Sequence, residues 1–290
     1  MLRGGPVLAL AVTAALAAPA AALAVPAAAQ YLYERTLMSA ADVRCHLFAP
    51  AVGRSLSAAR MQAHDAALRA GETPDGVAAL EARAQAKAAA TPCNAPGLKL
   101  AAERLRTAYA DYAKLQTLTF PGVRTSWKAE RPYPAYHGPP RWGLVQTTVG
   151  QGGWMLFGVV NGQVALLDAR RNVAPAASVR LVLRDPARLD QPYVDARRND
   201  PAAQMPPLDV SQVFIARSRA PAPKSLWPAG AQNAVTYQFP AEALPALARL
   251  DPREMAAVEL VYPSLKGDRV ATSWIEVGDL AAARAFLDAR

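Results

Sequence analysis

The chain has 290 residues, of which 52% are hydrophobic, and it carries a formal net charge of +9. This length is enough for two small domains, and a basic protein of this kind is attracted to anionic surfaces such as phospholipid headgroups or lipopolysaccharide. The positive charges are spread along the chain, and no basic helix, zinc finger or aromatic RNA-binding motif is present, which argues against nucleic acid as a partner.

The first 29 residues have the pattern of a secretory signal peptide. A single positive charge at Arg3 precedes an uncharged stretch from Val7 to Ala18, and small residues lead to Ala27-Ala28-Ala29 before Gln30. Signal peptidase recognises this order of a basic start, an apolar core and an A-x-A site, and the core is too short to span a bilayer. We therefore expect cleavage before Gln30, which lowers the formal net charge from +9 to +8 because one arginine leaves.

A second triplet of small residues, Ala22-Leu23-Ala24, is an alternative cleavage site. A different alternative is that the segment is not cleaved and stays as an anchor at the membrane interface. No cysteine lies beside either cleavage point, so no lipid anchor is expected on the new N-terminus. No later segment is apolar over the length that a transmembrane helix requires. The mature chain is thus expected to be a soluble protein of the periplasm, or a secreted one.

Only two cysteines are present, Cys45 and Cys93. An even pair in an oxidising compartment most simply forms one disulfide. The chain-entropy model gives such a bridge, which closes a loop of about fifty residues, a stabilisation of about 4 kcal/mol. A redox-active pair is the alternative, but the distant spacing without a C-x-x-C motif favours a structural bridge.

Residues 30–120 are rich in Ala, Leu, Arg and Glu and poor in β-branched residues, which is typical of helices. Thr73 is a suitable N-cap before a proline at the first helical position. An apolar stripe at alternating three- and four-residue steps supports the last helix of the segment. The expected helices begin near Glu34 and then cover Arg54–Ala70, Pro74–Ala90 and Leu98–Leu115. With the disulfide, this predicts a linked helical bundle or pair of helical hairpins.

Residues 121–141 alternate prolines with aromatic side chains. Proline at this density neither continues a helix nor supplies a central strand, so we expect an extended connector. Recognition of a ligand or partner is one role for its aromatic residues, although packing on a neighbouring domain is favoured. The aromatic residues are Trp127, Tyr133 and Tyr136, with Trp142 at the boundary.

Residues 142–290 change to a strand-like pattern. Asn161-Gly162 between two apolar runs predicts a hairpin, because a type I′ turn needs positive φ at both central positions. Two short helices are expected at about Glu242–Leu250 and Asp279–Ala289, each starting with an acidic residue that suits the positive end of the helix dipole. The expected strands are Leu144–Val149, Trp154–Val160, Gln163–Asp168, Ser178–Leu183, Val210–Ala216, Ala234–Phe239, Ala257–Tyr262 and Arg269–Val277. The whole chain is therefore predicted to be α+β, with a mainly antiparallel β domain after the helices.

One short segment, Glu276–Ala283, resembles the final strand and helix of invasion-associated-locus-B-type exported proteins. Its sequence is Glu-Val-Gly-Asp-Leu-Ala-Ala-Ala, which covers well under a tenth of the chain. No distinctive motif accompanies it, so the resemblance implies no activity and no site residues.

Catalytic and metal-binding motifs are missing from the sequence. There is neither a G-x-S-x-G nucleophile motif nor the Ser-x-x-Lys of penicillin-binding enzymes. The three histidines, His46, His64 and His137, are not clustered as zinc ligands usually are. A soft metal held by reduced Cys45 and Cys93 with His46 is the alternative to the disulfide. We expect no metal and no cofactor.

A loop region contains evenly spaced aspartates, and paired carboxylates can hydrolyse glycosides. Each of these aspartates is next to or near Pro or Arg, so turns and surface ion pairs account for them more simply. They are Asp185, Asp190, Asp195 and Asp200.

These observations favour a soluble periplasmic, non-enzymatic protein that binds an envelope protein or an anionic envelope component. One alternative is a hydrolase of cell wall or polysaccharide whose residues meet only in three dimensions. Another is a structural protein whose helical part mediates assembly. The sequence assigns no catalytic, cofactor-binding or metal-ligating residue.

Overall fold

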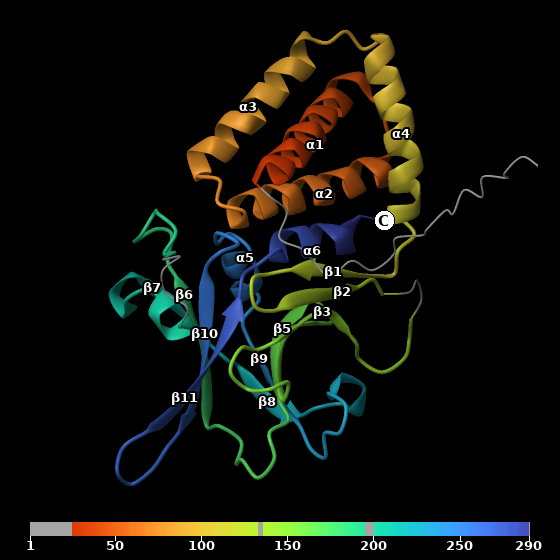
Figure 1. Ribbon diagram of the computed structural model, residues 1–290. Coiled ribbons are helices and arrows are strands. Elements are labelled where there is room, and N and C mark those ends of the chain that lie inside the picture. The colour runs from red at the N-terminus through yellow and green to blue at the C-terminus, as the bar shows by residue number, and fades with distance from the viewer. Residues whose placement is uncertain (1–24, 133–135, 195–199, 290) are drawn as a thin grey trace, which may run out of the picture.

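The computed structural model describes residues 25–132, 136–194 and 200–289. In these residues four long helices come first, and two antiparallel β-sheets with two short helices follow (Figure 1). This confirms the predicted α+β fold and its order along the chain. The segment expected to be the signal peptide lies outside the described residues up to Ala24.

The helical region consists of α1 to α4, and three of these helices start with proline, whose missing N–H costs nothing in a first turn. The helix after Thr73 is confirmed, and the Thr73 hydroxyl accepts a hydrogen bond from the Gly76 N–H at 3.0 Å. The helices α1, α2 and α4 begin earlier than expected, and α2 and α4 each start at a proline upstream of the predicted first residue. The bounds are α1 Val25–Cys45, α2 Pro50–Arg69, α3 Pro74–Ala90 and α4 Pro96–Tyr112.

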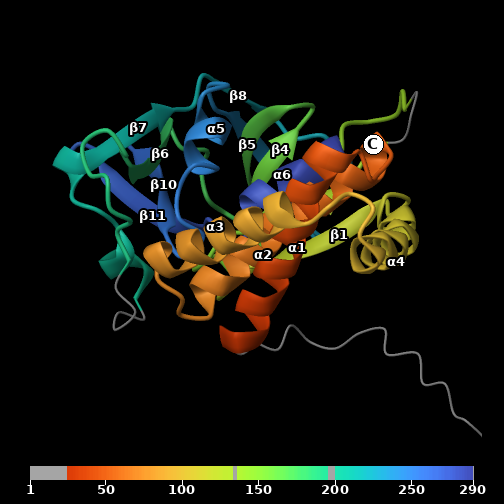
Figure 2. The same cartoon turned by 90° about the horizontal axis from the view of Figure 1, so that it is seen from above.

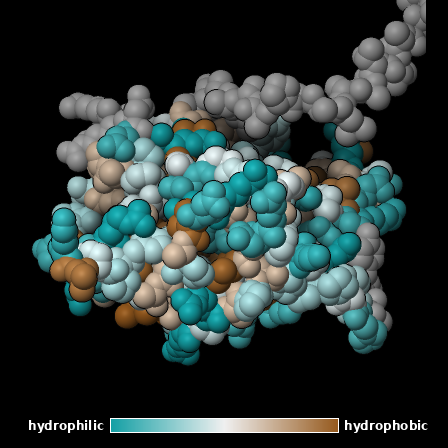
Figure 3. Space-filling view, turned by 90° about the horizontal axis from the view of Figure 1, so that it is seen from below, coloured by the Kyte–Doolittle hydropathy of each residue, from teal (hydrophilic) through white to brown (hydrophobic). Residues whose placement is uncertain are grey.

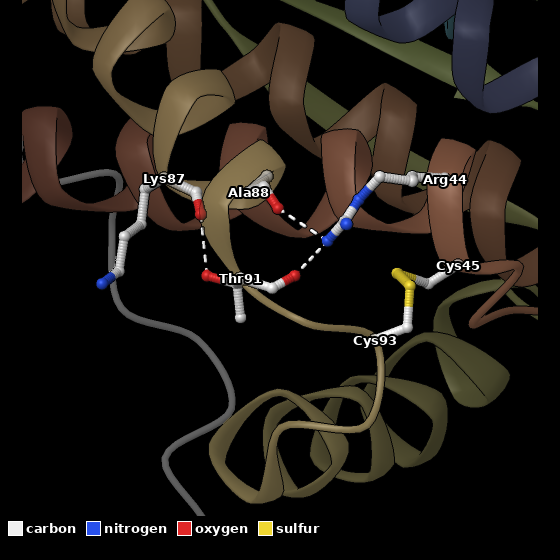
Figure 4. Close-up of a disulfide and its surroundings, with 6 residues drawn as sticks. All are labelled: Arg44, Cys45, Lys87, Ala88, Thr91 and Cys93. Atoms are coloured by element: carbon white, nitrogen blue, oxygen red, sulfur yellow. Dashed lines mark hydrogen bonds between the residues drawn. A yellow bond between two sulfur atoms is a disulfide. The ribbon is translucent and has the colours of Figure 1, made fainter.

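A disulfide holds the helical region together. Cys45 at the end of α1 is bonded to Cys93 in the loop between α3 and α4, with the two Cα atoms 5.5 Å apart (Figure 4). The neighbouring Arg44 side chain donates hydrogen bonds to the carbonyl oxygens of Ala88, at 2.9 Å, and Thr91. The predicted pairing is confirmed, and both described cysteines are consumed by it.

The larger sheet has seven strands in the order β1-β2-β3-β4-β5-β9-β8, all antiparallel. Asn161 and Gly162 both have positive φ between β4 and β5, which confirms the predicted hairpin. The strands are β1 Thr117–Pro121, β2 Ser126–Glu130, β3 Trp142–Thr147, β4 Met155–Val160, β5 Gln163–Asp168, β8 Ser218–Pro221 and β9 Val235–Gln238.

The smaller sheet has four strands in the order β11-β10-β6-β7. Side chains from both sheets and both short helices form one shared core, so the sheets pack face to face. Strands β7 and β8 follow each other directly and carry the chain from one sheet to the other. The elements are β6 Ser178–Arg184, β7 Ser211–Ile215, α5 Ala243–Leu247, β10 Met255–Tyr262, β11 Arg269–Glu276 and α6 Leu280–Asp288.

Three strands, β1, β2 and β8, fall outside the predicted set. Residues 121–141 were expected to form only an extended connector, yet β2 lies within them as an inner strand of the larger sheet. The prolines of this segment stand on either side of Ser126–Glu130, so the strand keeps every N–H donor that its neighbours need. Trp127 is 1% exposed in the core, which confirms packing as the role of this aromatic residue.

One carboxylate links the end of the chain to the β1–β2 turn. Glu276, the last residue of β11, is buried and accepts hydrogen bonds from the backbone N–H groups of Val123, Arg124 and Thr125 at 2.7 to 3.2 Å. The Trp127 indole N–H donates to the Glu276 carbonyl oxygen at 3.2 Å. These bonds bring α6, which starts just after Glu276, against the first strands of the larger sheet.

Candidate functional site

The three histidines lie in different parts of the fold. His46 is exposed immediately after α1, where its φ is 51°, and His137 is exposed between β2 and β3. His64, on α2, faces a cavity. Within residues 25–132, 136–194 and 200–289, no group of three or more His, Cys, Asp or Glu side chains is placed to hold a metal ion.

The loop aspartates separate into different roles. Asp185 accepts a hydrogen bond from the Ala187 N–H at 3.0 Å and pairs with Arg188 at 3.3 Å. Asp200 caps a short 3₁₀ helix by accepting from the Ala202 N–H at 3.1 Å. These are the turn and ion-pair roles favoured by the sequence. Asp195 lies outside the described residues, and Asp190 lines the cavity that contains His64.

This cavity, here called the junction pocket, lies between the helical region and the β region. Its volume is about 550 Å³, and its walls come from α2, α3, the loop after β6, the segment between α5 and β10, and the start of α6. Figures 1 and 2 show α2 lying over α6, which closes the inner side of the pocket. The pocket is thus formed only when the two regions pack together.

The floor of the junction pocket is apolar and its rim is charged. Buried aliphatic side chains from both regions form the floor, namely Leu68, Val77, Leu250 and Val277. On the rim, Arg60 of α2 pairs with Glu81 of α3 at 2.9 Å. Asp190 and Arg249 are exposed on the opposite side. A pocket of this kind suits a ligand that has an apolar body and groups of both charges.

His64 and Asp65 form a hydrogen-bonded pair at the helical wall. The His64 Nδ1 lies 3.1 Å from an Asp65 carboxylate oxygen, which leaves Nε2 available on a ring that is about one-third exposed. The hydrogen bond to Asp65 raises the pKa of His64, while burial opposes it. Burial raises the pKa of Asp65, and the bond to His64 opposes that. The pair therefore retains a proton more readily than the two isolated side chains would.

A buried ion pair connects the two regions behind this wall. The guanidinium of Arg69, at the end of α2, contacts the carboxylate of Asp279. Asp279 is 0% exposed and stands at the N-cap position of α6, where its side chain makes no capping hydrogen bond. Burial raises the pKa of Asp279 to about 7, although the positive charge of Arg69 opposes the shift. Breaking one half of such a pair leaves an uncompensated buried charge, so the contact holds α2 against α6 only while both partners remain.

A second buried ion pair forms the other wall. The Arg184 guanidinium binds both carboxylate oxygens of Glu254, at 2.6 and 2.9 Å, and both side chains are nearly inaccessible. Glu254 also accepts hydrogen bonds from the backbone N–H groups of Asp251 and Tyr193 at 2.9 and 3.1 Å. These bonds fix two loops of the pocket rim in place, because every bond converges on one carboxylate.

The lining of the junction pocket limits its chemistry. Among the described residues that line it there is no Ser, Thr, Cys or Tyr, so this surface offers no hydroxyl or thiol nucleophile. His64 is the side chain there that is best placed to move a proton, through Nε2, with Asp65 orienting the ring.

Two further cavities are lined by different side chains. One, of about 370 Å³, lies between the connector, the β4–β5 turn and the end of α6, and the Arg141 guanidinium there stacks 5.1 Å from the Tyr136 ring centre. The other, of about 560 Å³, is a groove between α1 and α4 lined by Tyr31, Leu37 and Leu105. Neither contains a pair of titratable groups like the one in the junction pocket.

Seen from below, most of the molecular face is hydrophilic, with hydrophobic residues in separate small areas (Figure 3). None of the described helices combines the length and the apolar character needed to cross a bilayer.

Comparison of the chain with models of protein families, with curated proteins and with solved structures finds no match. The junction pocket is therefore characterised by its own geometry. Most of its charged residues, including Arg60, Glu81 and Arg249, were not singled out from the sequence. His64 and Asp190 were named there, neither as a site residue, and the remaining contacts join residues that are far apart along the chain.

Proposed function

We propose that this chain is an exported accessory protein of the cell envelope that binds a segment of an envelope protein in the junction pocket. The pocket between two regions, with its apolar floor and charged rim, is the observation that carries the proposal. The Cys45–Cys93 disulfide and the N-terminal sequence support an oxidising compartment such as the periplasm.

The charges at the pocket favour a polypeptide over an anionic polymer. Arg60, His64 and Arg249 face the cavity, but Glu81, Asp190 and Asp251 face it too, so a polyanion would meet repulsion as well as attraction. A segment of protein offers apolar side chains for the floor and charges of both signs for the rim. Binding to an anionic envelope component is the alternative that salt dependence distinguishes.

The first turn of α1 supports a refined site for signal-peptide cleavage. Ala28 is 0% exposed and packs in a cluster with Leu32, residues of α2, and Val77. Cleavage before Gln30 would remove this turn, whereas cleavage after Ala24 leaves α1 whole. Mass spectrometry of the exported chain is expected to give Val25 as the N-terminal residue, and a chain that starts at Gln30 would contradict this assignment.

A capture experiment with matched variants tests the binding role. Ala78 and Ala79 are both exposed on α3, but only Ala78 lines the pocket. The exported chain, Ala78→Arg and Ala79→Arg are each used to capture proteins from periplasm and from detergent-solubilised envelope, at low and physiological salt. We expect a stoichiometric partner that survives physiological salt and is lost only with Ala78→Arg.

Each other outcome has a defined meaning. A partner retained by Ala78→Arg would place binding elsewhere on the molecule. Capture that disappears at physiological salt for every variant would favour an anionic component over a protein segment. The absence of any captured protein in either fraction would contradict the proposed function.

Hydrolysis of a wall or polysaccharide substrate is the second candidate, and the His64–Asp65 pair is the observation that favours it. In this case His64 Nε2 takes a proton from a water molecule as that water attacks the scissile carbon, and the proton then passes to the leaving group as its bond to the carbon breaks. Wall fragments released by the exported chain but not by His64→Gln would support this candidate. Equal release by both would exclude His64 from catalysis.

A further inference from the structure

The strand β7 forms an uncovered edge of the smaller sheet with apolar side chains on its surface. It pairs only with β6, and it is the terminal strand at the left of the molecule in Figure 1. Val213 is 47% exposed and Ile215 is 57% exposed. A terminal strand with exposed β-branched side chains can pair with a strand of another chain.

The backbone groups of β7 that face outward can be assigned from the hydrogen bonds at its two ends. The N–H of Ala216 donates to Val179 at 2.9 Å, and the N–H of Asp185 donates to Val210 at 2.9 Å. Even-numbered residues of β7 therefore bond to β6, and Val213 and Ile215 point their N–H and C=O groups away from it. In the described part of the chain, neither of these two N–H groups has a backbone partner.

The other sheet edges carry features that oppose such pairing. Strands β1 and β8 both end in proline, at Pro121 and Pro221, and β8 also exposes Arg219. The inner end of β11 is bridged by Val149, which pairs with Trp274. Strand β7 contains no proline, lysine or bulge. This edge thus differs from the other three in its lack of protection.

Charges on either side of β7 are complementary to a second copy of the same strand. Exposed Asp209 stands just before the strand, and Arg217 just after it with a side chain that is 71% exposed. In an antiparallel pair centred on Val213, Asp209 of each copy lies beside Arg217 of the other. A parallel arrangement would instead place like charges together, which costs energy.

We propose that β7 pairs antiparallel with β7 of a second copy of this chain, around a two-fold axis at Val213. The two smaller sheets then form one continuous sheet across the dimer, and each copy contributes the same surface, as a closed two-fold contact requires. A short strand buries a small area, so the dimer is expected to form in a concentration-dependent way. The inference does not rest on the proposed function, because it needs no ligand in the junction pocket.

Sedimentation of the exported chain over a range of concentrations is the first test, with two variants at one position. Val213→Pro removes an outward N–H that the monomer does not use, so the fold is kept while the pairing is lost. Val213→Thr keeps the β-branched shape and the N–H. We expect the wild type and Val213→Thr to dimerise, and Val213→Pro to stay monomeric with an unchanged circular dichroism spectrum.

A charge exchange tests the orientation of the pair. Asp209→Arg and Arg217→Asp each place like charges together, and each is expected to weaken dimerisation about tenfold. The double variant Asp209→Arg, Arg217→Asp restores opposite charges and is expected to recover the wild-type dissociation constant. Recovery requires two copies of this chain, because a different partner protein would not carry the compensating change.

Crosslinking gives a direct distance. Opposite residues of a hydrogen-bonded antiparallel pair have Cα atoms about 5.5 Å apart, which suits a disulfide. Val213→Cys is expected to crosslink into dimers, while Val270→Cys, which is similarly exposed on β11, is not. A chain that stays monomeric at every concentration, or a dimer that Val213→Pro and the single charge changes leave intact, would overturn the proposal.

Discussion

The helical region and the β region are held together by different means. The two core clusters of the helical region contain many alanines, among them Ala28, Ala41 and Ala102. The core of the β region instead contains large side chains from both sheets and from α6, such as Phe157, Leu181 and Phe286. Because burial stabilises in proportion to apolar area, alanine contributes little per residue. The comparison indicates that a cross-link and external contacts replace much of the missing core in the helical region.

Loss of the disulfide is expected to have the largest effect on stability and to destabilise the helical region more than the β region. The variant Cys45→Ala, Cys93→Ala should lower the unfolding free energy of the helical region by about 4 kcal/mol, since the bridge closes a loop of 48 residues. All five tryptophans lie after the helical region, so their fluorescence reports on the β region while circular dichroism reports mainly on the helices.

In urea, the circular dichroism transition should move to lower denaturant while the fluorescence transition stays close to its original midpoint. Equal shifts of both transitions would mean that the two regions unfold as one unit, and the comparison would then fail. Addition of reductant to the wild type serves as the matched control, because it removes the same bond without a substitution.

A core truncation in the β region is expected to have the reverse pattern. Leu166 is 0% exposed on β5, an inner strand of the larger sheet, and Leu166→Ala should lower stability by about 3 kcal/mol. The fluorescence transition should move to lower urea concentration, and by more than the circular dichroism transition. Leu100→Ala removes the same atoms from a side chain on α4 that is 51% exposed, and its effect should stay below about 0.5 kcal/mol. Similar losses for both would contradict the assigned core.

The contact between the regions should respond to pH through Asp279. Its raised pKa, about 7 against 3.8 in the unfolded chain, means that the folded state binds a proton more readily between these values. Stability from this group is therefore present at low pH and is lost as pH rises from about 4 to about 7. We expect wild type to lose about 3 kcal/mol relative to Asp279→Asn over this window.

Urea titrations of both chains at several pH values measure this difference. Asp268→Asn, which changes an exposed carboxylate in the turn between β10 and β11, should follow the wild-type profile. A parallel dependence for wild type and Asp279→Asn would show that Asp279 does not set the pH response of the junction.

Local patterns predicted much of the fold. The helix after Thr73, the hairpin at Asn161-Gly162 and most strands of the β region follow from caps, turn residues and alternation, each of which acts within a few residues. The prediction was incomplete where the local pattern conflicts with the tertiary structure. Proline density hid β2, although its five residues contain no proline and complete the larger sheet. The helix expected from Arg54 already starts at Pro50.

The candidate site was not predicted from the sequence, which named His64 and Asp190 but assigned neither to a site. Its ion pairs join Arg69 to Asp279 and Arg184 to Glu254, across sequence separations of 210 and 70 residues. No periodic pattern links such distant positions. The sequence assigned Asp279 only as the start of a helix, and the structure places it at the N-cap position of α6. Its burial depends on α2 lying over α6.

The sequence by itself determined the α+β class, the pairing of two cysteines and the order of helices before strands. Helix propensity and turn residues act over a few neighbouring positions, and two cysteines allow only one intramolecular pairing. Only the tertiary structure decided that the regions enclose a pocket, that Ala28 is buried, and that β7 is an open edge. Those features depend on which faces are covered by distant segments, and burial changes both the pKa of Asp279 and the availability of a strand for pairing.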